Sequence, residues 1–239
     1  FAPGGSLDSV MRILAPRVGE ALGQQVVIDN RPGAGGNLSA ELVARSAPDG
    51  YTIYVTSVAL VVNPSLYRKL SYDPIRDFAP ITLLGAAYNV LVAHPSLPVK
   101  RVADLVALAK RSPGKIDYVS TGKGTSGHLA MALFTHLAGI QLTHIPYKSI
   151  AQAQADLVAG QVPLFFPTIP GALPFIHAGR VRPLAVSSTV RSRALPEVPT
   201  MDEAGVKGYE ASAWYQVLAP ANTPRPVIDR LNQAFVDVL

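Results

Sequence analysis

The sequence predicts an α/β protein in which strands alternate with helices and most strands pair in parallel. Short apolar segments with strand character are followed by amphipathic helices along most of the 239 residues. Hydrophobic residues make up 49% of the chain and charged residues 15%, which supplies enough apolar surface for a core and too little charge for disorder. The 21 prolines and 19 glycines indicate many short elements joined by defined turns.

The composition also excludes several classes of function. The chain has no cysteine, which rules out disulfides, thiolate catalysis and Cys-ligated zinc or iron–sulfur centres. No apolar run reaches the roughly 18 residues that a membrane-spanning helix needs. The net charge is +5, but the basic residues are scattered and aromatic residues make up only 7%. This balance indicates a mild attraction for small anions and no nucleic-acid surface.

In the first part of the chain, helical and strand-like patterns alternate. Val10, Leu14 and Val18 share one face of a helix predicted over 8–22, which Gly23 ends. The elements expected next are a short buried strand at 26–28, a glycine-rich turn at 31–37, a helix at 38–46, a strand at 51–56, a helical stretch towards residue 66, and strands at 81–87 and 89–93.

The same alternation continues to the end of the chain. Helices are expected at 102–111, 126–138, 151–159 and 170–178, strands at 115–120, 143–146, 162–166, 183–187 and 213–219, and a last helix at 226–239. Both ends are expected to be truncated. Residues 1–5 are typical of a loop that follows a strand, and no glycine or polar cap follows the last helix. No signal peptide is visible, and with the start missing its absence says nothing about export.

The first glycine-rich loop precedes the first helix. Gly4 and Gly5 let backbone N–H groups approach a ligand closely, and Ser6 adds a hydroxyl at a helix N-terminus, which favours an anion. The alternative is a tight turn in which Ser6 or Asp8 caps the helix.

The second glycine-rich loop, at 121–128, lies between a predicted strand and a predicted helix. Gly122, Gly124 and Gly127 match G-x-G-x-x-G, but no acidic residue follows in the 143–148 region, where a dinucleotide site would need one. Binding of a small anion and a purely structural role therefore stay open beside the dinucleotide site. Two amide-rich loops on two α/β units suggest a ligand held between them, beyond the carboxyl ends of the strands.

Other polar residues give weaker signals. Ser57 ends a strand, Ser149 is expected to cap a helix, and Lys148 is expected to be solvated. The spacing of His128, His136 and His144 does not fit a helical zinc pair, and no G-x-S-x-G elbow is present, so we expect neither a metal nor a catalytic site. His128, at a helix start, is expected to bond backbone or ligand rather than to act as a base.

Eleven motifs in order along nearly the whole chain resemble those of one family. They are Pro3–Asp8, Asn30–Asn37, Ala47–Thr52, Asn63–Tyr67, Tyr72–Pro74, Asp77–Pro80, Gly124–Leu129, His144–Lys148, Gly160–Val162, Leu195–Thr200 and Leu218–Pro220. Together they resemble the Bug family, the extracytoplasmic solute receptors of tripartite tricarboxylate transporters. The resemblance implies a periplasmic, non-enzymatic, monomeric protein without a cofactor, which binds a small carboxylate and delivers it to the membrane components of the transporter.

The resemblance also implies a type II periplasmic-binding-protein fold, with two α/β domains around a ligand cleft. Domain 1 would comprise 1–93 and 190–239, domain 2 would comprise 94–189, and the hinge would lie near Ala93–His94 and Ser187–Thr189. The ligand-binding residues carried over are Gly4, Gly5, Ser6, Asp8, Ser57, Val58, Thr121, Gly124, Thr125, Ser126, His128, Ser149, Ile150, Ala151 and Thr168. Among them, Asp8 is expected to order its loop rather than to meet an anion directly.

The sequence departs from the family pattern after Gln161-Val162. The family often has Asp at the positions of Pro163 and Pro167, and the second Asp can meet a ligand's ammonium group. Pro167 has neither a charge nor an N–H, so we expect a plain carboxylic acid rather than an amino acid. The acid is expected to be a di- or tricarboxylate or an aromatic acid, and the apolar share of wall residues such as Val58, Ile150 and Thr168 favours an aromatic or aliphatic acid. The alternatives left open are an enzyme that uses a nucleotide at Gly122–Gly127 and a ligand-sensing receptor component.

Overall fold

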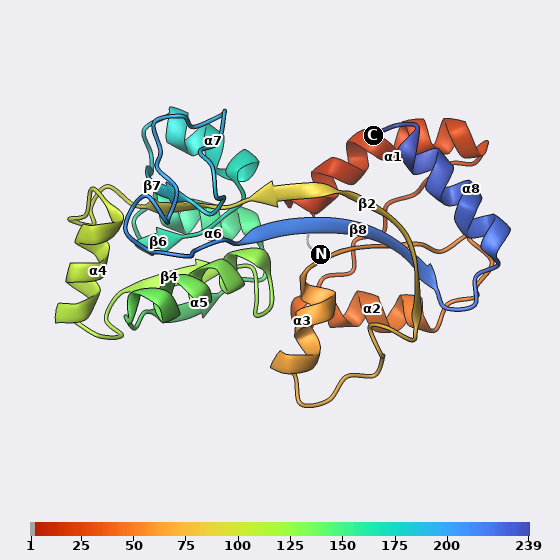
Figure 1. Ribbon diagram of the computed structural model, residues 1–239, viewed down its shortest axis with the longest axis horizontal. Coiled ribbons are helices and arrows are strands. Elements are labelled where there is room, and N and C mark those ends of the chain that lie inside the picture. The colour runs from red at the N-terminus through yellow and green to blue at the C-terminus, as the bar shows by residue number, and fades with distance from the viewer. Residues whose placement is uncertain (1–2) are drawn as a thin grey trace. The chain divides into compact units, whose positions relative to one another are not determined.

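The computed structural model describes residues 3–239, and the chain divides into two compact units. Unit 1 comprises Phe1–Ala86 and Trp214–Leu239, and unit 2 comprises Ala87–Ala213. The chain passes from one unit to the other twice, within strands β2 (Phe78–Tyr88) and β8 (Ser212–Pro220), which are neighbours in one sheet (Figure 1). No helix of the described part of the chain is long and apolar enough to cross a membrane.

Unit 1 contains a three-stranded sheet in the order β1-β8-β2. Strand β1 (Tyr54–Ser57) is antiparallel to β8, with Tyr54 opposite Leu218 and Ser57 opposite Tyr215. The helices of this unit are α1 (Ser6–Leu22), α2 (Asn37–Ala44), α3 (Ala59–Leu66) and α8 (Arg225–Val236), with a short 3₁₀ turn at Ala34–Gly36. Apolar faces of α1 and α8 form one core together with residues of β2 and β8, as the predicted periodicity of both helices requires.

The strand predicted at 26–28 is not formed. The segment has no regular structure and does not belong to the sheet of unit 1. Val26 and Ile28 still pack against the core of α1 and α8, whereas the side chain of Val27 is 77% exposed. The expectation of a buried strand is therefore wrong both for its pairing and for Val27. A strand needs a neighbour to pair its backbone groups, and an apolar run does not supply one.

Unit 2 contains a five-stranded sheet in the order β5-β4-β6-β3-β7. Its strands are β3 (Val90–Ala93), β4 (Asp117–Ser120), β5 (Thr143–Pro146), β6 (Leu164–Phe165) and β7 (Arg182–Val186). Strand β4 is parallel to β5 and β6, whereas β3 is antiparallel to β6 and β7. The expectation of mostly parallel sheets is therefore wrong, because apolar runs do not encode the direction of a strand.

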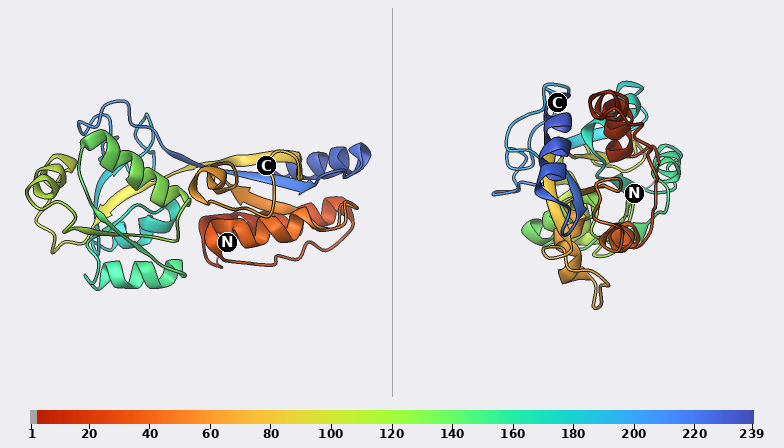
Figure 2. Two further views of the ribbon diagram at one scale, coloured as in Figure 1. Left: turned by 90° about the horizontal axis from the view of Figure 1, so that it is seen from below. Right: turned by 90° about the vertical axis from the view of Figure 1, so that its right-hand side faces the viewer.

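Helices cover both faces of this sheet. Helices α4 (Val102–Arg111) and α5 (Ser126–Ala138) pack on one face, and α6 (Ile150–Val158) and α7 (Ile169–His177) pack on the other (Figure 2, left view). Alternate residues of β3 enter the two cores: Leu91 and Ala93 face α4 and α5, while Val90 and Val92 face α6 and α7. Burial of the sheet on both faces explains why β3 and β6 are continuously apolar.

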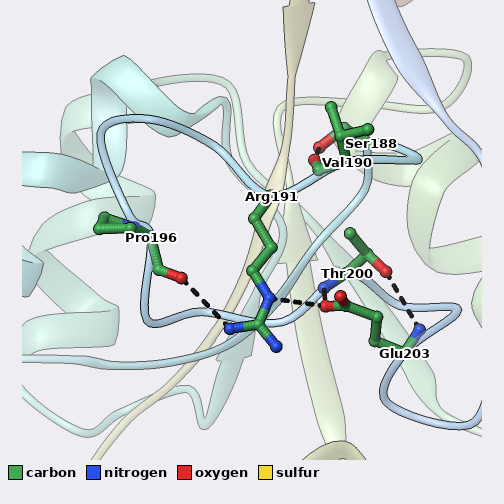
Figure 3. A network of polar contacts seen from close by, with 6 residues as sticks. All are labelled: Ser188, Val190, Arg191, Pro196, Thr200 and Glu203. Carbon is green, nitrogen blue, oxygen red and sulfur yellow. Dashed lines mark hydrogen bonds and ion pairs between the residues drawn. The ribbon is translucent and has the colours of Figure 1, made fainter.

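The unit boundaries differ from those that the family resemblance implied. Strand β3 pairs on both sides within the sheet of unit 2, so the expected boundary and hinge at Ala93–His94 lie inside that unit. Residues 190–213 also belong to unit 2 rather than to domain 1. Figure 3 shows polar contacts within the first part of this segment. Arg191 donates to Glu203 at 2.8 Å and to the carbonyl of Pro196 at 3.3 Å, while the N–H of Thr200 donates to Glu203 at 2.9 Å.

Candidate functional site

In unit 2, three parallel strands end at the same edge of the sheet, and each is followed by a helix. Ser120 is opposite Pro146, and Val119 is opposite Phe165, so the carboxyl ends of β4, β5 and β6 lie level. Helices α5, α6 and α7 begin a few residues after these strands. The first N–H groups of a helix have no acceptor within it, and its N-terminus carries about half a positive charge. Three such N-termini at one sheet edge form an arrangement suited to an anion.

The loop between β4 and α5 is held in shape by hydroxyl groups. Gly122 and Gly124 have φ of 126° and 83°, a backbone region in which a side chain would be strained. The N–H of Gly122 donates to Oγ of Ser120 at 3.1 Å, and Oγ1 of Thr125 donates to the carbonyl of Gly122 at 2.8 Å. The N–H of Thr125 is directed to the same carbonyl, at 3.4 Å. The two donors of Thr125 are therefore used within the loop, which assigns this predicted ligand residue a shaping role.

Gly127 has a packing role. A Cβ atom at this position would lie 2.7 Å from the carbonyl oxygen of Phe166, which is closer than real Cβ contacts. The glycine thus lets the first turn of α5 approach the segment that follows β6. The third glycine of the G-x-G-x-x-G pattern is explained by this approach, without a nucleotide.

The remaining predicted residues of unit 2 lie at or next to helix N-termini. Ser149 precedes α6, and its Oγ accepts a hydrogen bond from the N–H of Gln152 at 3.5 Å, which confirms the expected cap. Thr168 precedes α7, is 8% exposed and makes no side-chain hydrogen bond within residues 3–239. The others are Thr121, which follows β4, Gly124 in the loop, Ser126 at the start of α5, and Ile150 and Ala151 at the start of α6.

His128 and His144 lie beside the β4–α5 loop. Their rings are 4.7 Å apart, and His144 also stacks on Tyr118 at 4.9 Å. Nδ1 of His128 accepts from the N–H of Gly124 at 3.4 Å, and Nε2 of His144 is 2.7 Å from Oγ of Ser120. Burial, together with His128 and the nearby Lys123, lowers the pKa of His144 to about 4. Burial and Lys123 also lower the pKa of His128, so both rings are neutral at pH 7.

In unit 1, Asp8 closes the loop that precedes α1. Its Oδ2 accepts from the N–H of Gly4 and from Nε of Arg12, both at 2.9 Å, and its side chain is 3% exposed. The hydrogen bond from Arg12 lowers the pKa of Asp8 against the effect of burial, and the Gly4 N–H lowers it further. Asp8 therefore orders the loop, and the N–H of Gly4 is used internally. The donors that the loop directs elsewhere come from the first turn of α1, which begins at Ser6 after Gly5.

Two further hydroxyl groups accompany Ser6 in unit 1. Oγ of Ser6 is 2.6 Å from the phenol oxygen of Tyr215, a residue of β8 that is 7% exposed. Ser57, opposite Tyr215 in the sheet, ends β1, and Val58 leads into α3. The sequence analysis named Ser6, Ser57 and Val58 as candidates but not Tyr215. An aromatic residue in an apolar strand is typical of a core, and only the tertiary structure places its phenol group beside Ser6.

A groove of about 500 Å³ lies elsewhere in unit 1. It is lined by Leu7 and Asp8, by residues 24–31 and by residues 50–55 beside the outer edge of β1. Of the predicted ligand residues it contains only Asp8, and its wall is largely apolar. The groove is therefore distinct from the sheet edge where the helix N-termini of unit 2 converge, and we place the candidate site at the helix N-termini.

Comparisons with known proteins agree on one family. Residues 10–239 match the model of the tripartite tricarboxylate transporter family receptor, TctC. Protein BugT of Bordetella pertussis is 37% identical over 241 residues, which cover 100% of this chain and 74% of BugT. A protein of the tcbD–tcbE intergenic region of Pseudomonas sp. strain P51 is 42% identical over 233 residues, which cover 97% of this chain and 69% of that protein.

Solved structures give the same assignment. Rpa4515 of R. palustris, solved with adipate, superposes with a TM-score of 0.93 at 39% identity and covers 98% of this chain and 79% of its own. MatC of Rhodopseudomonas palustris, solved with bound malate, has a TM-score of 0.93 at 32% identity and covers 100% and 81%. The periplasmic binding protein BugD has a TM-score of 0.92 at 36% identity and covers 98% and 79%. The α/β periplasmic-binding-protein fold predicted from the sequence is thereby confirmed.

Proposed function

The chain belongs to the tripartite tricarboxylate transporter receptor family and is a periplasmic solute-binding protein, and from this premise we propose how it recognises its ligand. The family is one of receptors rather than enzymes, which excludes the nucleotide-using enzyme that the glycine pattern left open. We propose that the protein binds a small carboxylate through the helix N-termini of unit 2, that the opening loop of unit 1 carries a second group of ligand donors, and that the ligand is then passed to the membrane components of the transporter.

The convergence of α5, α6 and α7 at the ends of β4, β5 and β6 supports the carboxylate as the recognised group. A carboxylate is an acceptor-only group, and this edge of the sheet offers first-turn N–H donors together with the hydroxyls of Ser126 and Thr168. Hydrogen bonds to charged groups contribute roughly 1.5–3 kcal/mol each. A handful of them, less the cost of association, reaches the roughly −8 kcal/mol of micromolar affinity.

The proposed ligand contacts follow from which donors the structure has already used. In unit 2 they are the hydroxyls of Thr121, Ser126 and Thr168 and the first-turn amides of α5, α6 and α7. In unit 1 they are the amides of the first turn of α1 and the hydroxyls of Ser6 and Ser57. The hydroxyl of Ser57, like that of Thr168, makes no hydrogen bond within the described chain. Thr125 and Asp8 shape their loops, and His128 remains uncharged beside the ligand.

The same residues favour a plain acid over an amino acid. The stretches 121–128, 147–151 and 166–169 contain no Asp or Glu that could pair with an ammonium group. Pro167 is buried, carries no N–H and uses its carbonyl to accept from the N–H of Val90 at 2.9 Å. Val58 and Ile150 add apolar surface, which favours an aliphatic or aromatic acid. Among the relatives, one structure holds adipate and another holds malate.

A ligand panel tests this proposal. Adipate, malate, benzoate, aspartate, glutamate and ATP are each added to the protein, and the unfolding temperature is measured, followed by calorimetric titration of every hit. A ligand present at 100 times its Kd stabilises the folded state by about 2.7 kcal/mol. We expect a plain carboxylate to bind, and Thr168→Val to weaken it without lowering stability. Binding of amino acids alone would contradict the argument from Pro167, and failure of every carboxylate would overturn the proposed recognition.

A further inference from the structure

We propose that Tyr215 is a positioning residue of the ligand site: its phenol group holds the hydroxyl of Ser6 so that the pair presents one O–H donor to the carboxylate. This inference rests on the proposed function and adds a residue that the motifs did not indicate. Both side chains belong to unit 1, although 209 residues separate them in the sequence. Tyr215 belongs to β8, and Ser6 is the first residue of α1.

The geometry of the pair is that of a short, well-formed hydrogen bond. Oγ of Ser6 and the phenol oxygen of Tyr215 are 2.6 Å apart, at the short end of the range for O–H···O bonds. Tyr215 is 7% exposed, and burial raises the pKa of its phenol, so the group keeps its proton at neutral pH. Its neighbour across the strand pair is Ser57, whose side chain extends from the same face of the sheet.

The count of protons explains what the pair can do. Two hydroxyl groups carry two hydrogens, and the bond between them uses only one. Neither oxygen makes another hydrogen bond among residues 3–239. Whichever hydroxyl donates, the other hydrogen is left for a third group, and hydrogen bonds in such a chain polarise one another. A carboxylate oxygen, which only accepts, is the complementary partner.

A buried tyrosine with a purely structural bond differs in this respect. Tyr209, in unit 2, donates its O–H to the backbone carbonyl of Ala130 at 2.7 Å, and the bond leaves no hydrogen over. Tyr209 and Tyr215 are both buried, at 1% and 7% exposure, and each makes one hydrogen bond. Of these two tyrosines, only Tyr215 is paired with a side chain at a helix N-terminus. The pairing also fixes the rotamer of Ser6 before a ligand arrives, which removes part of the ordering cost of binding.

The test compares five variants of the protein with the wild type by calorimetric titration of adipate, malate and benzoate. Tyr215→Phe removes the phenol oxygen, Ser6→Ala removes the donor that it positions, and the double variant removes both. Tyr209→Phe is the matched control. We expect Tyr215→Phe to weaken binding about 3- to 10-fold, in line with one neutral hydrogen bond. Ser6→Ala is expected to weaken binding at least as much, and the double variant should be within twofold of Ser6→Ala.

The control separates positioning from folding. Tyr209→Phe should lower the unfolding temperature of the ligand-free protein but leave affinity within twofold of the wild type. Ser6→Thr, which keeps a hydroxyl at the same place, should retain affinity within threefold even if Tyr215→Phe does not fold.

Any of three results would overturn the positioning role alone. The first is an unchanged affinity in Tyr215→Phe, and the second is a double variant whose loss of affinity is the product of the two single losses. The third is an equal loss of affinity in Ser6→Thr and Ser6→Ala. If the wild type binds none of the three acids, the proposed function fails together with this inference.

Discussion

Replacing Gly127 by Ala tests how closely α5 must approach the end of β6. The added Cβ would lie 2.7 Å from the carbonyl oxygen of Phe166 and 4.0 Å from Nδ2 of Asn89, which donates to that same carbonyl at 2.8 Å. Both residues are almost completely buried, so the backbone has little freedom to retreat.

The magnitude follows from three contributions. Forcing a methyl group into a packed interior costs about 1–3 kcal/mol, and loss of the Asn89 hydrogen bond would add about 1 kcal/mol. The higher helix propensity of Ala returns about 1 kcal/mol. We therefore expect Gly127→Ala to lower the free energy of unfolding by about 1–3 kcal/mol in urea titrations. Ligand affinity should fall as well, because the first turn of α5 has to move.

Gly171→Ala is the matched control, since Gly171 also lies in the first turn of a helix at this sheet edge. Its Cβ would lie 3.5 Å from Oγ1 of Thr168 and 3.8 Å from Nε2 of Gln154, which are ordinary contacts. We expect this variant to be as stable as the wild type or more stable by up to about 1 kcal/mol. Equal stability of Gly127→Ala and the wild type, or equal destabilisation of both variants, would refute the argument from close approach.

Three further predictions concern charge and hydroxyl groups. Asp8→Asn should lower the free energy of unfolding, measured by urea titration, by about 1–2 kcal/mol, because it weakens the hydrogen bonds from Gly4 and Arg12. A variant as stable as the wild type would show that the loop is ordered without the carboxylate. The pKa of His144 is about 4 in the folded protein and about 6.5 when unfolded, so the unfolded chain takes up the proton first as the pH falls. The contribution of His144 to the free energy of unfolding should therefore be fully present above about pH 6.5 and decrease towards pH 4. At pH 5 the loss should be about 1 kcal/mol, after allowance for solvent screening of this half-buried ring. In urea titrations at pH 7 and pH 5, His144→Gln should remove much of that difference. Thr168→Val should weaken carboxylate binding several-fold in calorimetry, while the unfolding temperature of the ligand-free protein stays within about 2 °C of the wild type. The reason is that the Thr168 hydroxyl makes no hydrogen bond within residues 3–239. An unchanged affinity would show that this hydroxyl does not contact the ligand.

Local signals in the sequence were sufficient for most elements. The helices expected at 102–111 and 126–138 and the strand expected at 143–146 have these bounds in the structure. Helix α5 illustrates the reason, because its apolar periodicity, the preceding Thr125 and the terminating Gly139 all lie within a few residues of one another. The helix N-termini that follow the strands of unit 2 could be located for the same reason.

The features that the sequence predicted wrongly depend on the pairing of strands that are distant in the chain. Residues 26–28 have strand composition but no strand beside them in the sheet of unit 1. Strand β3 joins unit 2 because β6 and β7 flank it, which moves the unit boundary away from Ala93.

The sequence by itself determined the class of elements, their order, the family and the amide-rich loops, because these depend on local periodicity, turn chemistry and motifs. Only the tertiary structure decided strand direction, the limits of the two units, and which donors are already used. Gly4 and Thr125 donate their hydrogen bonds within their own loops, whereas Ser6 is hydrogen-bonded to Tyr215, which is 209 residues away in the sequence. A hydrogen bond needs two groups within about 3 Å, and no local pattern in a chain specifies a distance of that kind across a fold.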